Sequence, residues 1–248
     1  MPFQYSRRCW RALLPLLLVL VAPAFAEESP EAVIAAKIGQ ARPDLLVEAV
    51  RPSVATGLYE VDIKGGLTVY STADGDFFVL GDLFAVGIDG LVNVSEQQRD
   101  LVRKEMLAEV SAEDMIIFAA DGERRGVVTV FTDVDCFYCQ KLHQEVPTLN
   151  KMGVEVRYLA YPRAGVGSDS FRKIASAWCA ENPQQAITSL KNRQEIPENV
   201  CPGNPVADQF MLGQQAGVRG TPALVLESGQ LLPGYMSAED LTQRMGIN

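Results

Sequence analysis

Histidine is nearly absent from the 248-residue sequence, where His143 stands alone, and basic residues are scarce, with 22 lysines and arginines against 31 acidic residues. A structural zinc site needs four ligands, mostly closely spaced cysteines and histidines, so zinc binding fits this chain poorly. The net charge of −9 makes nucleic acid and anionic membrane surfaces poor partners. We therefore expect no metal, no cofactor and no nucleic acid.

Long hydrophobic runs are also missing, except for residues 12–22 near the N-terminus. That run is too short to span a bilayer, which argues against a membrane anchor. Arginines at positions 7, 8 and 11 precede it, and Ala24-Phe25-Ala26 follows as a small-x-small cleavage site. This pattern predicts a cleaved signal peptide over residues 1–26, whose removal leaves an exported chain of 222 residues with a net charge of −12.

Cysteine is sparse, and an even number of cysteines remains once the signal peptide is removed. Cys9 leaves with that segment, and Cys136, Cys139, Cys179 and Cys201 remain. An even number of cysteines in an exported protein favours disulfide bonds, and four cysteines allow three pairings.

The first part of the exported chain has the pattern of a small antiparallel sheet. A short helix is expected over residues 30–40, and strands are expected over residues 45–94. Residues 59–64 alternate between apolar and charged side chains, which predicts a strand with one wet face. Gly65-Gly66 is typical of a two-residue hairpin turn. Such a module is small for an independent core, so something else is expected to cover its apolar face or its edges.

Residues 95–111 are expected to form a linker helix between two domains. Ser95 and Gln98 have the spacing of a capping box, which marks a helix N-terminus. Apolar residues then recur every four positions from Val102 to Val110, which gives the helix a narrow apolar stripe. A surface helix within a single domain is the alternative.

After Ser111 the pattern changes to alternating strands and helices, which predicts layered α/β packing. Strands are expected at residues 115–119, 127–131, 154–160 and 223–226, and helices at 136–152, 168–181, 184–192, 204–216 and 237–245. The run at 127–131 is β-branched and apolar, as in a buried strand.

Cys136 and Cys139 form a Cys-x-x-Cys motif where a strand passes into a helix. A helix N-terminus offers unpaired backbone N–H groups and a partial positive charge. Both favour a thiolate, which is the form that attacks a disulfide sulfur. Cys136, at the exposed end, is therefore the expected nucleophile with a lowered pKa, although Asp133 and Asp135 oppose that shift. Cys139 lies on nearly the same face and can displace a stalled mixed disulfide.

Other uses of this motif fit less well. Covalent haem attachment needs a histidine directly after the second cysteine, where this chain has Gln140. A cysteine hydrolase needs a base beside its nucleophile, but His143 lies seven helical residues beyond Cys136, about 10 Å along the axis. We expect His143 to be a packed or solvated residue, or one that tunes the pair. A purely structural disulfide between Cys136 and Cys139 is the remaining alternative.

Two further features accompany the motif. Cys179 and Cys201 flank a polar helical segment, where a bridge would be a structural staple contributing roughly 3 kcal/mol by loop entropy, or else a second redox pair. Thr221-Pro222 precedes the strand expected at 223–226, a position where proline is tolerated. An ordinary turn is the alternative for Thr221-Pro222.

Together these residues resemble the DsbC/DsbG family of periplasmic disulfide isomerases. The resemblance is carried by residues 130–143 (VFTDVDCFYCQKLH), by Trp178-Cys179 and Cys201, and by Gly220-Thr221-Pro222-Ala223. It covers nearly the whole exported chain, including the expected sheet module and linker helix.

The resemblance implies an α+β and α/β architecture. Its parts would be an N-terminal antiparallel-sheet dimerisation domain (27–94), a linker helix (95–111) and a thioredoxin-like α/β catalytic domain with a helical insertion (112–248). It further implies Cys136 as nucleophile, Cys139 as resolving thiol, a structural Cys179–Cys201 bridge, and substrate contacts from Phe137, Tyr138, Thr221 and a cis Pro222.

By the same resemblance the chain would be a periplasmic homodimer that isomerises disulfides in misfolded exported proteins. A membrane thiol reductase of the DsbD type would keep it reduced. A dithiol oxidase and a chaperone are the alternatives.

Two departures from the family bear on the chemistry. Phe137-Tyr138 stands where Gly-Tyr is usual in disulfide isomerases, and these positions influence redox potential. Val130 stands where thioredoxins carry a buried aspartate, so that proton acceptor for Cys139 is missing.

Overall fold

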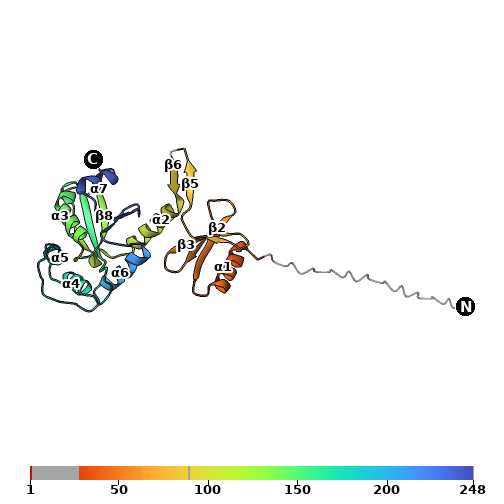
Figure 1. Cartoon of the computed structure of the whole chain (residues 1–248), viewed down its shortest axis with the longest axis horizontal. Coiled ribbons are helices and arrows are strands. Elements are labelled where there is room, and N and C mark those ends of the chain that lie inside the picture. The colour runs from red at the N-terminus through yellow and green to blue at the C-terminus, as the bar shows by residue number, and fades with distance from the viewer. Residues whose placement is uncertain (2–27, 89, 248) are drawn as a thin grey trace.

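The computed structural model describes residue 1, residues 28–88 and residues 90–247, which form two lobes joined by a helix (Figure 1). The signal peptide predicted over residues 1–26 lies outside the described residues, apart from Met1. Within the described part of the chain, every helix is too short or too polar to cross a membrane.

The N-terminal lobe is an antiparallel sheet covered by a helix. Its elements are α1 (Pro30–Ala41), β1 (Val47–Pro52), β2 (Leu58–Ile63), β3 (Leu67–Thr72) and β4 (Phe78–Val79). The four strands lie in the order β1-β2-β3-β4. Helix α1 packs Ile34 and Ile38 against Val61, Ile63 and Val69, so the helix supplies the cover that the apolar face of the sheet requires.

The turn between β2 and β3 is longer than the predicted two-residue hairpin. Ile63 pairs with Leu67, so Lys64, Gly65 and Gly66 all lie in the turn. The φ angles of the two glycines are 100° and 85°, a region that residues with a side chain rarely adopt.

The predicted wet face of β2 is only partly wet, because Glu60 is buried. Its carboxylate lies 2.9 Å from the guanidinium of Arg51 on the neighbouring strand. The hydroxyl of Ser53 also donates to it, at 3.4 Å. These partners replace the water that the carboxylate loses on burial.

A separate hairpin leads into the linker. It consists of β5 (Phe84–Gly87) and β6 (Gly90–Asn93), and it projects above the start of α2 (Val94–Ala108) in Figure 1. The strands agree with the expectation for residues 45–94, but their pairing as a separate hairpin was not expected from the sequence.

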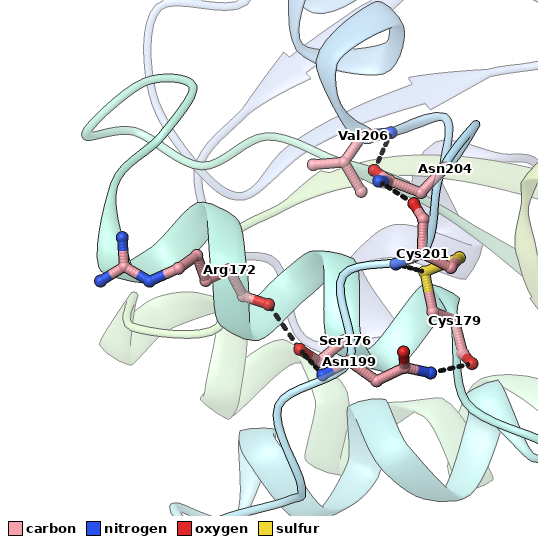
Figure 2. Close-up of a disulfide and its surroundings, with 7 residues drawn as sticks. All are labelled: Arg172, Ser176, Cys179, Asn199, Cys201, Asn204 and Val206. Carbon is pink, nitrogen blue, oxygen red and sulfur yellow. Dashed lines mark hydrogen bonds between the residues drawn. A yellow bond between two sulfur atoms is a disulfide. The ribbon is translucent and has the colours of Figure 1, made fainter.

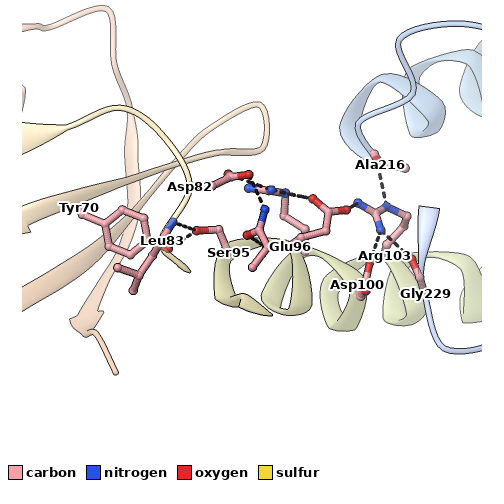
Figure 3. A network of polar contacts seen from close by, with 11 residues as sticks. Tyr70, Asp82, Leu83, Ser95, Glu96, Asp100, Arg103, Ala216 and Gly229 are labelled. Carbon is pink, nitrogen blue, oxygen red and sulfur yellow. Dashed lines mark hydrogen bonds and ion pairs between the residues drawn. The ribbon is translucent and has the colours of Figure 1, made fainter. Parts of the chain in front are cut away.

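The start of α2 corrects the predicted capping box. Asn93 is the N-cap, and its side chain accepts a hydrogen bond from the backbone N–H of Glu96. Ser95 is buried instead, where its hydroxyl accepts from the N–H of Leu83 at 2.7 Å and hydrogen-bonds the hydroxyl of Tyr70 at 2.6 Å. Ser95 therefore fastens the linker helix to the N-terminal lobe (Figure 3).

The C-terminal lobe is a mixed sheet surrounded by helices. Its strands are β7 (Ile116–Phe118), β8 (Gly126–Thr132), β9 (Val154–Ala160), β10 (Ala223–Leu226) and β11 (Leu231–Pro233). Its helices are η1 (Ala112–Asp114), α3 (Phe137–Lys151), α4 (Asp169–Trp178), α5 (Pro183–Lys191), α6 (Val206–Gln215) and α7 (Ala238–Arg244). The sheet order is β11-β10-β8-β9-β7, with β8 and β9 parallel and the other neighbours antiparallel. The predicted α/β packing is confirmed, and every residue of β8 is buried.

Arg103 docks the linker helix onto this lobe (Figure 3). Its buried guanidinium donates to the carbonyl of Ala216 at 2.8 Å and to that of Gly229 at 2.6 Å. Asp100 and Glu96 on the same helix pair with it. A Cβ at Gly229 would lie 1.8 Å from the carbonyl oxygen of Asp100, so only glycine permits this close approach.

Candidate active site

The two free cysteines lie where β8 passes into α3. Cys136 is the N-cap of α3, and Cys139 lies in the first turn of that helix. The connection is a tight turn, in which the carboxylate of Asp133 accepts from the N–H of Asp135 at 2.9 Å and the carbonyl of Asp133 accepts from the N–H of Cys136 at 3.3 Å. The predicted position of the motif at a helix N-terminus is therefore correct.

The sulfur atoms are less accessible than expected. Cys136 is 4% exposed and Cys139 is 1% exposed, so the expectation of an exposed nucleophile is wrong. Thr221 explains the cover, since its carbonyl oxygen lies 3.2 Å from Cys136 Sγ and accepts a hydrogen bond when Cys136 is protonated. The Thr221-Pro222 peptide bond is cis, as the resemblance implied.

Phe137 and Tyr138, which separate the two cysteines, are both exposed. Their rings contact each other edge to face, with centroids 5.5 Å apart. The surface beside Cys136 is therefore aromatic, and it suits contact with an apolar segment of another protein.

Hydrogen bonds lower the pKa of Cys136 to about 5, and the largest cause is the thiol of Cys139 as a donor. Burial acts in the opposite direction, while the hydroxyl of Thr221, the backbone N–H of Cys139 and the charge of Arg163 lower the pKa further. The lowered value agrees with the expectation from the helix N-terminus, but the neighbouring thiol contributes more than the backbone. Cys136 is therefore a thiolate near neutral pH.

Asp133 and Asp135, which were expected to oppose this ionisation, have compensating partners. Burial alone would raise the pKa of Asp133, but hydrogen bonds from Ser170 and from Arg163 hold it below its usual value. Asp135 lies 2.9 Å from the ammonium of Lys173. Each of the two carboxylates therefore has a cationic partner of its own.

The Thr221 hydroxyl is the one buried side-chain polar atom of the described residues that lacks a hydrogen-bond partner. An unpaired buried hydroxyl is costly, so it is expected to serve an acceptor that forms during function. The thiolate of Cys136 is such an acceptor, since Thr221 contributes to lowering its pKa.

Burial strongly raises the pKa of Cys139, and its hydrogen bond to Cys136 raises it further. The charge of Lys191 acts the other way and lowers it. Cys139 is therefore a thiol while Cys136 is a thiolate. No pattern in the sequence marked Lys191 or Arg163, because both reach the site from other elements of the fold.

His143 is a buried structural residue. Its Nδ1 lies 2.9 Å from the hydroxyl of Tyr158, and its Nε2 lies 3.0 Å from the hydroxyl of Thr188. Burial, with the charge of Lys191 as a smaller cause, lowers its pKa to about 4. The ring is therefore neutral at pH 7, as expected for a packed residue.

Cys179 and Cys201 form a disulfide that joins the end of α4 to the segment before α6 (Figure 2). Asn199 anchors the same segment, since its side chain donates to the carbonyl of Cys179 and its N–H donates to the hydroxyl of Ser176. In the described part of the chain, no group of three or more histidine, cysteine or acidic residues is arranged to hold a metal ion.

Comparison with known proteins gives consistent matches over both lobes. Residues 24–96 match the N-terminal domain of disulfide bond isomerase proteins, and residues 111–246 match a thioredoxin-like domain. The thiol:disulfide interchange protein DsbC of Escherichia coli K12 is 34% identical over 196 residues, which cover 78% of this chain and 79% of that protein. The protein of the same name from Haemophilus influenzae is 33% identical over 79% of this chain and 82% of its own. A solved disulfide interchange protein from Neisseria gonorrhoeae is 30% identical, with a TM-score of 0.48 over 54% of this chain and 97% of that structure.

Proposed function

The chain belongs to the DsbC family of thiol:disulfide interchange proteins, and we propose that it isomerises wrong disulfide bonds in exported proteins, with Cys136 as nucleophile and Cys139 as resolving thiol. Family membership and the thioredoxin-like domain confirm the predicted resemblance and enzyme class, a thiol–disulfide oxidoreductase. The observation that carries the site assignment is the pair of free cysteines at the N-terminus of α3, with the pKa of Cys136 lowered to about 5.

The first step is attack by the Cys136 thiolate on a substrate disulfide. A bond forms between Cys136 Sγ and one substrate sulfur, and the other substrate sulfur leaves as a thiolate. Phe137 and Tyr138 offer an apolar surface to the substrate, and the backbone of Thr221 lies against the reacting sulfur. The exposed rings and the Thr221-Pro222 loop are therefore the proposed substrate contacts.

Two outcomes follow from the mixed disulfide. In isomerisation, a different substrate thiolate attacks the substrate sulfur that is bonded to Cys136, so a new substrate disulfide forms and Cys136 leaves as a thiolate. In reduction, Cys139 attacks Cys136 Sγ, and the substrate leaves reduced while the enzyme holds a Cys136–Cys139 disulfide. A membrane thiol reductase of the DsbD type would restore the dithiol, because an isomerase must begin its cycle as a thiolate.

A homodimer is supported by exposed apolar residues of the N-terminal lobe. They lie on and around β4 and the β5–β6 hairpin, and they include Phe78, Val79, Leu80, Phe84, Val86 and Leu91. Apolar patches of this kind mark interaction surfaces in soluble proteins. We assign dimerisation to residues 27–94, linkage to residues 95–111, catalysis to residues 112–248, and the periplasm as the compartment.

Refolding of a scrambled ribonuclease by the reduced protein tests the proposal. We expect wild type to restore ribonuclease activity, Cys136→Ser to lose this effect, and Cys139→Ser to accumulate mixed disulfides visible on non-reducing gels. Because a lowered cysteine pKa also stabilises the reduced form of an oxidase, the oxidised protein is assayed beside it on reduced ribonuclease. Activity confined to the oxidised protein would identify an oxidase, and equal rescue by a double serine variant would identify a chaperone.

A further inference from the structure

Lys191, the last residue of α5, is a fully enclosed cation close to the dithiol. It is 2% exposed, and its Nζ donates to the hydroxyl of Thr132 at 2.6 Å and to the carbonyl of Asp133 at 2.9 Å. Within the described residues, none of the ion pairs includes Lys191. Buried lysines are rare unless a negative charge accompanies them, so this one requires an explanation.

The contacts of Lys191 hold its charge at the active site. Thr132 ends β8, and Asp133 begins the turn that leads to Cys136, with its carbonyl accepting from both Lys191 and the N–H of Cys136. The ammonium also lies 5.8 Å from the centroid of the Tyr158 ring. Lys191 is thus fixed on the strand and turn that carry the two cysteines.

The charge that Lys191 meets most strongly is that of Cys139. Among the charges that raise the pKa of Lys191, Cys139 comes first, ahead of Asp133, Cys136 and Asp135, and Lys191 in turn lowers the pKa of Cys139. Lys191 therefore gains an anionic partner whenever Cys139 becomes a thiolate.

The other ionisable groups around the pair cannot take this role. His143 on α3 is neutral because burial lowers its pKa to about 4, and burial keeps Tyr158 on β9 neutral by raising its pKa. Arg163 is half-exposed and already paired with Asp133, so solvent and that carboxylate screen its charge.

We propose that Lys191 is a positioning residue for the resolving step, in which its buried ammonium favours the thiolate of Cys139. This inference rests on the proposed function and deepens it. Once Cys136 is joined to substrate, it no longer carries the negative charge that accepts the Cys139 hydrogen bond. Burial is then the main obstacle to ionising Cys139, and Lys191 is the enclosed charge that opposes it.

The step balances without another reagent. Cys139 loses its proton, and its thiolate forms a bond with Cys136 Sγ while the bond from Cys136 to the substrate sulfur breaks. The departing substrate sulfur takes the electron pair and a proton equivalent to the one that Cys139 released. Cys139 is oxidised and the substrate sulfur is reduced.

Single-turnover reaction of the reduced protein with dithiobis(nitrobenzoic acid) separates the two steps. This aromatic disulfide releases one coloured thiolate when Cys136 attacks and a second when Cys139 resolves the mixed disulfide. In Lys191→Met we expect the first release to keep its rate and the second to slow about tenfold at neutral pH, with its pH profile displaced toward higher pH. Lys191→Gln, which keeps hydrogen-bond donors but lacks the charge, is expected to behave like Lys191→Met.

Lys141→Met is the matched control, because it removes an exposed lysine from α3. We expect it to leave both releases within about twofold of wild type. Three results would overturn the role of the charge. The second release could keep its rate in Lys191→Met, it could return to the wild-type rate in Lys191→Gln, or it could be slowed equally at every pH. Loss of the first release in the wild-type protein would instead contradict the proposed function itself.

Discussion

Cys136 and Cys139 are close neighbours in one helical turn, yet their surroundings drive their pKa values apart. Cys136 is the acceptor for the Cys139 thiol, which is the largest stabilising influence on its thiolate, and Thr221 lowers its pKa as well. Cys139 is deeper and donates that bond, so burial and donation both favour its thiol. This difference lets Cys136 attack as a thiolate, while Cys139 stays a thiol until Cys136 is bonded to a substrate sulfur.

The buried ammonium of Lys191 lowers the stability of the folded protein, although its charge serves the proposed resolving step. Burial lowers its pKa to about 8 in the folded protein, whereas lysine in the unfolded chain titrates near 10.5. Below pH 8 both states hold the proton, and the folded state bears the full cost of burying the ammonium. Between these two values the unfolded chain binds more protons, so the free energy of unfolding rises with pH.

We therefore expect Lys191→Met to be more stable than wild type at pH 7 by about 3 kcal/mol, from about 1.4 kcal/mol for each pKa unit. The difference should narrow as the pH is raised from 8 toward 10.5. Urea unfolding of both proteins across this range checks it, with the Cys136–Cys139 disulfide formed so that neither thiol titrates. A difference that does not change with pH would mean that Lys191 is not buried as an ammonium.

For single residues, the sequence predicted the reactive groups better than it predicted the residues packed around them. The Cys-x-x-Cys motif, its place at a helix N-terminus and the lowered pKa of Cys136 were all predictable from local spacing. Lys191 and Arg163 were not, because tertiary packing alone brings them to the cysteines. The expected exposure of Cys136 failed for the same reason, since the Thr221 loop that covers it is distant in the chain.

Helix α2 is the element that connects the two lobes, and polar contacts fix its start and its middle (Figure 3). Ser95 joins its start to Leu83 and Tyr70, and Arg103 joins its middle to the C-terminal lobe. Leu107 near its end packs against the core of that lobe. These contacts favour a firm link over a loose tether.

Replacing Arg103 by Met is expected to lower the free energy of unfolding by about 3 kcal/mol, because the carbonyls of Ala216 and Gly229 lose their donor. Arg99→Met is the matched control on the same helix, since its ion pairs with Asp82 and Glu96 are half-exposed. Arg99→Met should lower the free energy of unfolding by less than about 1 kcal/mol. Urea unfolding measures both, and equal losses would contradict a docking role for Arg103.

Most helices and strands followed from periodicity, because apolar side chains repeat with the spacing of the element that buries them. The strands at residues 154–160 and 223–226 have the predicted bounds. The errors lie where a local signal competes with a tertiary contact. Ser95 matched a capping box but is used in a contact between elements, and β11 is too short to show a period.

For the whole molecule, the structure separates an apolar N-terminal surface from the C-terminal lobe that carries the dithiol (Figure 1). Val86 and Leu91 face each other across the β5–β6 hairpin, and they are 87% and 69% exposed. An exposed apolar surface of this kind marks an interaction site. The sequence predicted that something covers the sheet module, and helix α1 covers one face of it, whereas a second copy was implied only by the family resemblance.

Changing Val86 and Leu91 together to Lys is expected to convert the dimer to a monomer, because two charges would be buried at the interface. Analytical ultracentrifugation measures the change. The reaction of Cys136 should persist, while refolding of scrambled ribonuclease should fall severalfold. Val54→Lys, at an exposed valine between β1 and β2, is the control and should remain dimeric. A dimeric double variant with full refolding activity would place the interface elsewhere.

Titration of the Cys136 thiolate by its ultraviolet absorbance tests whether Cys136 is ionised at neutral pH. We expect a pKa of about 5 in the wild-type protein, and a rise toward the ordinary value near 9 in Cys139→Ala, where the largest stabilising hydrogen bond is removed. A wild-type pKa near 9 itself, with slow alkylation at neutral pH, would contradict this expectation.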